Sequence, residues 1–187
     1  MKTETIDYLT QDELKKLLNT VASKRDRAII YLAYTYGLRA SEVGSLTRED
    51  IDFTRLKIRV NRLKNSISSE YPLRPKVAQF LKAYLRTRKD TSPVLFLSKR
   101  GLPISRRTLD WLMKEYGKKA TLHSDKQHFH VLKHSIATHM LDAGADIMFV
   151  KDWLGHKNIQ NTLIYAQLTN RTRDEQAKKI LASPRIV

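Results

Sequence analysis

The residues that point most directly to chemistry are a histidine and a tyrosine near the carboxyl end of the chain. His156 follows Leu154 and Gly155, and Tyr165 lies nine residues later within the stretch Lys157–Gln167. A tyrosine hydroxyl can attack phosphorus, but its unperturbed pKa of about 10 makes it a poor nucleophile at neutral pH. It needs cations or a base close by to react. Such groups elsewhere in the chain decide whether Tyr165 is a nucleophile or an ordinary half-buried helix tyrosine.

Candidate partners for this tyrosine occur in two upstream segments. Arg39 stands at an expected helix start in G-L-R-A-S-E, and Glu42 lies three residues on, on the same helix face. Further along, His130 and Lys133 also share a helix face, so a proton-transfer group and a fixed cation point the same way. His134 lies four residues after His130, a spacing seen in metal sites, but the lysine between them opposes cation binding. We therefore expect no metal site and no cofactor.

The charge balance indicates a polyanionic partner. The 187 residues include 35 Lys plus Arg against 19 Asp plus Glu, a formal net charge of +16. Nucleic acid is the first candidate for such a field, with anionic lipid as the alternative. The absence of cysteine excludes disulfides, thiolate metal sites and cysteine nucleophiles. No apolar run of transmembrane length and no signal segment occur, which predicts a cytoplasmic protein with no membrane partner.

The elements that must position these residues are mostly helices. Capping residues and apolar spacing predict helices over 11–22, 25–36, 75–89, 130–143, 146–154 and 171–182, one that opens after Ser105, and a short one that carries Tyr165. Strands are expected over 53–60, 70–73 and 94–97. The prediction is a single domain over residues 1–187, mainly α with a small antiparallel β-sheet.

The first expected strand has a basic face. Three basic residues alternate with three apolar ones: Arg55, Lys57 and Arg59 on one side, Leu56, Ile58 and Val60 on the other. Such a face is often only solvated. Arg62 and Lys64 follow at the tip, however, and favour a hairpin that faces phosphate groups.

Taken together, these segments resemble the catalytic domain of the tyrosine recombinases (phage integrases, Xer and Cre-type enzymes). The motifs that carry the resemblance are G-L-R-A-S-E with Arg39, Lys64 after the basic strand, H-V-L-K-H-S-I-A-T-H-M-L with His130 and Lys133, and L-G-H-K-N followed by Tyr165. Their order is the family's. The resemblance extends from about Thr10 to the end of the chain, without an N-terminal core-binding domain. The R-L-K-N hairpin is similar to that of the short fimbrial-switch invertases.

The resemblance implies a role for each matching residue. Arg39 would clamp the non-bridging oxygens of a DNA phosphodiester with its planar fork. Lys64 would protonate the leaving 5′ oxygen, His130 would hold or accept a proton near the nucleophile, and His156 would donate to a phosphate oxygen. Tyr165 would attack and leave a 3′-phosphotyrosine link, which a second 5′ hydroxyl reverses without ATP or a metal ion.

Two positions leave alternatives open. Glu42 would orient Arg39, or it is only a surface helix carboxylate. The family pattern is H-x-x-R, and this chain has Lys133 in its place. A lysine keeps the charge but loses the bidentate fork, so the chain is an active enzyme, a slow one, or a catalytically impaired one.

The expected function is site-specific recombination of double-stranded DNA, by a chain that is monomeric when free and forms a homotetramer on DNA. The helix over 171–182 would dock on its own domain or, following the resemblance, on a neighbouring protomer. The alternatives are a non-catalytic DNA-binding protein of the same fold and a type IB topoisomerase-like enzyme. The basic residues expected to contact DNA are Arg55, Lys57, Arg59, Arg62, Lys99, Arg100, Arg106 and Arg107.

Overall fold

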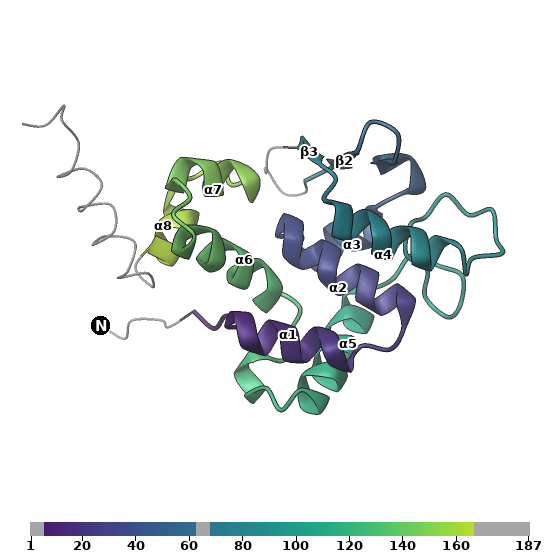
Figure 1. Ribbon diagram of the computed structural model, residues 1–187, viewed down its shortest axis with the longest axis horizontal. Coiled ribbons are helices and arrows are strands. Elements are labelled where there is room, and N and C mark those ends of the chain that lie inside the picture. Colours follow the sequence, from purple (N-terminus) through teal and green to yellow (C-terminus); the bar gives the residue numbers. More distant parts are fainter. Residues whose placement is uncertain (1–5, 63–67, 167–187) are drawn as a thin grey trace, which may run out of the picture.

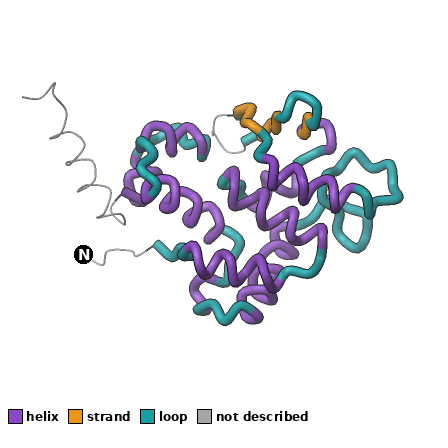
Figure 2. Tube along the Cα trace, viewed as in Figure 1, coloured by secondary structure: helices purple, strands orange, loops and turns teal. Residues whose placement is uncertain are grey.

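The computed structural model describes residues 6–62 and 68–166 of the chain. Within these ranges the protein is mainly helical with a small antiparallel sheet, as expected (Figures 1 and 2). The α-helices are α1 (Gln11–Thr20), α2 (Lys24–Tyr36), α3 (Ala40–Ser45), α4 (Pro75–Leu85), α5 (Arg106–Lys119), α6 (Val131–Asp142), α7 (Ile147–Trp153) and α8 (Gln160–Ala166). Short 3₁₀ turns occupy Arg48–Asp50 and Ser124–Lys126. Lys64 and the expected helix over 171–182 lie outside the described residues.

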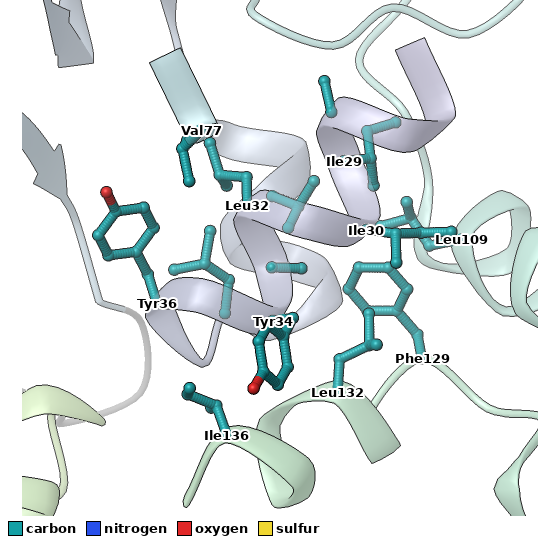
Figure 3. Packing of buried hydrophobic residues seen from close by; sticks show 14 of the residues in the cluster. Ile29, Ile30, Leu32, Tyr34, Tyr36, Val77, Leu109, Phe129, Leu132 and Ile136 are labelled. Carbon is teal, nitrogen blue, oxygen red and sulfur yellow. The ribbon is translucent and has the colours of Figure 1, made fainter. Parts of the chain in front are cut away.

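The central element is α2, whose buried residues form the middle of the core (Figure 3). It packs against α4 on one side and α6 on the other. Ile29, Ile30 and Leu32 of α2 are fully buried, with Leu109 of α5 and Leu132 of α6 nearby. Helix α6 also contacts α7 and α8. The packing of α6 on α2 therefore fixes the position of α7 and α8 relative to the core.

Local sequence signals account for the helix ends. Thr10 and Glu13 form a reciprocal capping box at the start of α1, with the Glu13 carboxylate accepting from the Thr10 N–H at 2.7 Å. Ser105 caps α5. Gly37 ends α2 at a φ of +57°, and a Cβ at this position would collide with the side chain of Leu154. The end of α2 and the segment after α7 therefore approach more closely than any other residue would allow.

The sheet has three short strands in the order β1 (Ile51–Asp52), β2 (Lys57–Val60) and β3 (Ser69–Pro72). Both pairings are antiparallel, and Ile58 lies between Ile51 and Tyr71. The strand expected over 53–60 is shorter than predicted, because Leu56 has a φ of +53° and turns the chain. Arg55 therefore lies in the turn and not on a continuous basic strand face.

Two other boundary predictions are wrong. The helix expected over 75–89 ends at Leu85. Arg88, three residues later, donates to the carbonyls of Val94 and Leu95 and so fixes the following loop. The segment 94–97 makes only isolated bridges, from Val94 to Thr47 and from Leu97 to Pro103. None of the described helices combines the length and the apolar character that crossing a bilayer requires.

Candidate active site

Arg39 is the N-cap residue of α3, and its side chain lines a cavity of about 360 Å³. The cavity is lined by Arg39, Ala40, Ser41, Arg106, Asp110, Phe129 and His130. It lies where the starts of α3, α5 and α6 meet. Both arginines and His130 thus face one hollow of a size that fits small polar groups.

The carboxylate of Glu42 holds Arg39 in place. Its Oε1 accepts from Arg39 Nη1 at 2.9 Å, and its Oε2 accepts from the Arg39 backbone N–H at 2.8 Å. Glu42 is 1% exposed, so it is not a surface helix carboxylate. Burial alone would raise the pKa of Glu42, but Arg62, the Arg39 N–H, Lys133 and the Arg39 guanidinium together lower it. The carboxylate is therefore ionised and orients Arg39.

Arg62 does not project toward solvent, so its expected place at an exposed hairpin tip is wrong. Its side chain has no exposed surface. It forms an ion pair with Glu42 at 2.9 Å and donates to main-chain carbonyls of Tyr36 and Trp153. This burial removes Arg62 from the candidate DNA contacts.

Lys133 and His130 are close in the sequence but differ in environment. His130 is exposed and lines the cavity, whereas Lys133 is 1% exposed and donates from Nζ to the Leu154 carbonyl at 3.0 Å. Burial lowers the pKa of Lys133 well below its usual value, and the charges of Arg62 and Arg39 add to this effect. The surrounding protein and the Lys133 and Arg39 charges likewise lower the pKa of His130. Lys133 thus supports the chain just before His156 and does not line the cavity.

His156 lies in the turn between α7 and α8, and its side chain is buried. Its Nδ1 is 3.0 Å from Oγ1 of Thr162, a fully buried residue of α8. Burial lowers the pKa of His156 to about 3, with Lys133, Arg39 and Arg62 acting in the same direction. The imidazole is therefore neutral at pH 7, and its ring is fixed by Thr162.

Tyr165 lies on α8, where it packs against α6, and is 2% exposed. Its hydroxyl is 2.9 Å from Nδ1 of His134. Burial raises the pKa of Tyr165 to about 12, opposed by the charge of Arg39, and burial lowers that of His134 to about 3. These values keep both partners neutral, so the hydroxyl is not ionised in this position.

Arg39 is the group that relates these residues to one another. Its charge acts on four of the residues singled out in the sequence, namely His130, Lys133, His156 and Tyr165. The charge of one guanidinium on α3 thus influences the pKa values of groups on α6, the α7–α8 turn and α8. Long-range packing of α6 on α2 brings them together.

Sequence reasoning missed three residues of this region. His134 was considered only as half of a metal pair, although it is the partner of Tyr165. Thr162 and the buried role of Arg62 were also missed. The strand alternation held the signal for Arg62, because Ile58, Val60 and position 62 fall on the same inward side.

The other basic residues expected at a DNA surface are exposed or partly exposed. Several have acidic neighbours: Arg55 pairs with Asp52 at 2.7 Å, Lys57 with Glu70 at 3.5 Å, and Arg59 with Asp50 at 3.1 Å. The side chains of Lys99, Arg100, Arg106 and Arg107 are all exposed, and Arg106 pairs with Asp110 at 3.6 Å. Trp111, 55% exposed, lies beside Arg106 and Arg107 along α5 and adds an aromatic surface to this basic helix.

The profile of the Phage integrase family matches residues 7–172 of the sequence. The chain belongs to the phage integrase family. One relative is the tyrosine recombinase XerA of Pyrococcus horikoshii, 38% identical over 174 residues, which cover 91% of this chain and 60% of XerA. Another is the type 1 fimbriae regulatory protein FimE of Escherichia coli K12, 31% identical over 167 residues and 84% of each chain. This integrase-family chain thus spans about three fifths of the length of XerA.

Solved structures of integrase-family proteins share the fold. A crystal structure of XerA recombinase superimposes with a TM-score of 0.82 at 28% identity, over 94% of this chain and 65% of that one. The XerH recombinase bound to its palindromic difH substrate gives a TM-score of 0.77 at 23% identity, over 94% and 53% of the two chains. The expected recombinase-like fold is confirmed.

Two histidines with lowered pKa values, His134 and His156, predict that the free energy of unfolding decreases in acid. The pKa of each is about 3 in the folded protein and about 6.5 when unfolded. The unfolded chain therefore binds more protons between these values, and the free energy of unfolding decreases as pH falls below about 6.5, by at most about 1.4 kcal/mol per histidine per pH unit. Urea unfolding at about pH 7 and about pH 5 measures this.

The control for this pH experiment is His123, whose side chain is 72% exposed. His156→Gln should reduce the pH dependence, whereas His123→Gln should leave it unchanged. An equal effect of the two substitutions would contradict the assignment.

Proposed function

We propose that this protein cuts and rejoins DNA at specific sites, with Tyr165 as the nucleophile. The observation that carries the proposal is the cavity shared by Arg39 and His130, with His156 and Tyr165 on the α7–α8 turn and α8, which pack against α6. The tyrosine oxygen forms a bond to phosphorus, the bond from phosphorus to the 5′ oxygen breaks, and the 5′ hydroxyl leaves with a proton. A 5′ hydroxyl from a second end reverses the step, so the link itself conserves the bond energy.

The charges of this site suit that reaction. Negative charge builds up on the non-bridging oxygens during transfer, and donors already in place lower the barrier most. Arg39, fixed by Glu42 and facing the cavity, provides the planar fork for these oxygens. His130 lines the same cavity and is neutral at pH 7, as a proton acceptor must be. His156 is the further donor, and the proton donor to the leaving oxygen in this proposal is Lys64.

Double-stranded DNA is the proposed substrate. XerH is bound to difH DNA in its crystal structure, and this chain has a formal net charge of +16. Contact with about six phosphates would lower affinity about a thousandfold between about 50 and 200 mM salt. Fluorescence anisotropy with a labelled duplex at a series of salt concentrations measures the slope, and a flat response would contradict nucleic-acid binding.

Assembly on DNA is also part of the proposal. Joining two DNA sites needs two cleaved duplexes held together, so we propose a homotetramer on DNA formed from free monomers. Sedimentation of the protein with and without duplex DNA distinguishes this arrangement from a monomer that binds alone.

Covalent trapping tests the reaction itself. The protein is incubated with nicked duplexes drawn from the genomic neighbourhood of its gene, denatured with detergent and separated by electrophoresis. We expect a protein band shifted by the attached strand, and protease treatment should remove the shift. DNA binding without any such adduct would contradict the proposal.

Lys133 favours a second candidate function, that of a DNA-binding protein with impaired catalysis. Its buried Nζ donates a hydrogen bond to the Leu154 carbonyl, and a lysine has no planar, bidentate donor group to offer a phosphate. Lys133→Arg separates the two functions. A large gain in adduct formation indicates an impaired enzyme, and binding without adducts in either form indicates a binding protein.

A further inference from the structure

Arg62, two residues after the end of β2, is a cation whose side chain is fully buried, and its guanidinium contacts three parts of the fold. Its side chain makes five hydrogen bonds. The acceptors are the carbonyls of Tyr36 (2.8 Å), Gly37 (3.2 Å) and Trp153 (2.9 Å), the Tyr71 hydroxyl (3.3 Å) and Oε2 of Glu42 (2.9 Å). Only Nε has no partner among the described residues.

The three carbonyls come from the ends of two helices. Tyr36 and Gly37 close α2, and Trp153 is the last residue of α7. The final carbonyls of a helix have no partner within it, and they carry the negative end of the helix dipole. A planar guanidinium can satisfy several of them at once. Arg62 therefore joins the end of α2 to the end of α7, two helices that lie far apart in the sequence (Figure 1).

The ion pair with Glu42 extends this junction to Arg39. Glu42 accepts from Arg62 through Oε2 and from Arg39 through Oε1, each at 2.9 Å. Two guanidinium groups thus fix one carboxylate from opposite oxygens. If Arg62 releases Glu42, the carboxylate loses one of the two guanidinium groups that fix it, and the Arg39 fork is held less firmly.

The bond to the Trp153 carbonyl extends the junction in the other direction. The Tyr71 hydroxyl donates to the same oxygen at 3.1 Å. The next carbonyl, that of Leu154, accepts from Lys133 Nζ. The backbone N–H of His156 donates to the carbonyl of Lys151, in the last turn of α7. The position of His156 thus depends on where the end of α7 is held.

We propose that Arg62 is a positioning residue for the reaction. It fixes the position of Arg39 relative to the segment that leads to His156. The inference rests on the proposed function, since the relative position of Arg39 and His156 matters only if the two act together in phosphoryl transfer. Arg62 itself touches no substrate. It acts through Glu42 on one side and through the end of α7 on the other.

Arg62→Lys tests this assignment. A lysine keeps the charge but places its donors on one nitrogen, so it cannot reach Glu42 and both helix ends together. We expect the rate of single-turnover adduct formation to fall about 10- to 100-fold, because small misplacements of reacting groups reduce rates by about this much. DNA affinity should change less than about threefold, because Arg62 is buried and makes no DNA contact.

The matched control is Arg88→Lys. Arg88 is also buried, with 5% of its side chain exposed. It also donates to a carboxylate, that of Asp90, and to three carbonyls, those of Ser92, Val94 and Leu95. It lies after α4, and the partners named here are in the loop over residues 90–95. Both variants are compared at a temperature where each is fully folded. If Arg62→Lys slows adduct formation no more than Arg88→Lys, Arg62 is only structural and the proposal is overturned.

A second readout does not depend on activity. Hydrogen exchange of backbone amides in α3 and in residues 154–162 should speed up about tenfold in Arg62→Lys and remain unchanged in Arg88→Lys. Increased exchange at both places in a protein that forms no adducts would support the junction while refuting the recombinase function. Unchanged exchange at either place would overturn the junction, whatever the activity.

The pair with Glu42 supplies the last control. If Arg62 acts on Arg39 through Glu42, then Arg62→Lys combined with Glu42→Gln should slow adduct formation less than the two separate effects multiplied together. Fully multiplicative effects would show that Arg62 and Glu42 act independently, and would overturn that half of the proposal.

Discussion

Tyr165→Phe should abolish the covalent protein–DNA adduct and leave DNA binding intact. Phenylalanine has no oxygen to attack phosphorus, so the rate should fall at least about a thousandfold, as it does when other enzymes lose their nucleophile. Single-turnover trapping on a nicked duplex measures the rate, and anisotropy measures the affinity. Adduct formation by the variant would show that another residue is the nucleophile.

Loss of the hydroxyl also leaves a histidine nitrogen unpaired, and the chain offers a close match for that effect. Tyr34 is buried, and its hydroxyl is 2.9 Å from Nδ1 of His139, also on α6. Tyr34→Phe therefore removes the same kind of bond at a site away from Arg39. Both variants should lose about 1–2 kcal/mol of stability, but only Tyr165→Phe should lose adduct formation.

The bond between Tyr165 and His134 also predicts how the reaction begins. With pKa values of about 12 and about 3, the two groups do not exchange a proton in this arrangement. The reacting hydroxyl must therefore exchange His134 for the phosphate and its cations. His134→Ala should weaken the resting position of Tyr165 without removing the nucleophile, so adduct formation should persist in this variant.

Glu42→Gln should be the most destabilising single substitution at this site. Glu42 is the carboxylate that faces Arg39, Arg62 and Lys133, and its side chain and that of Arg62 have no exposed surface. Removing its charge leaves Arg62 buried without a counter-charge, which typically costs about 3–5 kcal/mol. Urea unfolding at pH 7 should show this loss, a large part of an ordinary domain's stability of about 5–15 kcal/mol.

A pH series and a second glutamate test the cause. The pKa of Glu42 is lowered in the folded protein, so its contribution is present above its usual value of 4.5 and is lost as pH falls through the folded value. The difference between wild type and Glu42→Gln should therefore shrink in acid. Glu13→Gln removes a partly exposed pair with Lys126 and should cost less than about 1 kcal/mol. Equal losses at Glu13 and Glu42 would contradict the role of burial.

The sequence allowed the helices to be predicted because their ends carry local signals. Thr10, Ser105 and Gly37 act within one turn of the chain, so a reader of the sequence sees the same contacts that the fold uses. The strand over 53–60 was overextended because alternation continues through Leu56, where a left-handed φ breaks it. Local patterns do not reveal that kind of turn at a leucine.

The site was predictable as a set of residue types but not as a set of contacts. Arg39, His130 and Tyr165 were recognised from motifs, yet the bond from Tyr165 to His134 spans 31 residues and depends on how α8 packs on α6. Arg62 was placed at a surface because it is basic. Its inward direction follows from strand alternation, which outweighs residue type when a carboxylate and helix ends provide partners.

The aromatic packing at the end of α7 gives the protein an intrinsic fluorescence signal for the contact between α7 and α2. Trp153 stacks on Tyr36 with ring centroids 6.0 Å apart and donates from its indole to the Thr35 carbonyl at 3.0 Å. The chain has two tryptophans, and the other, Trp111, is exposed. In a Trp111→Phe background, the emission of Trp153 would report directly on whether α7 stays seated against α2, in real time and without an attached dye.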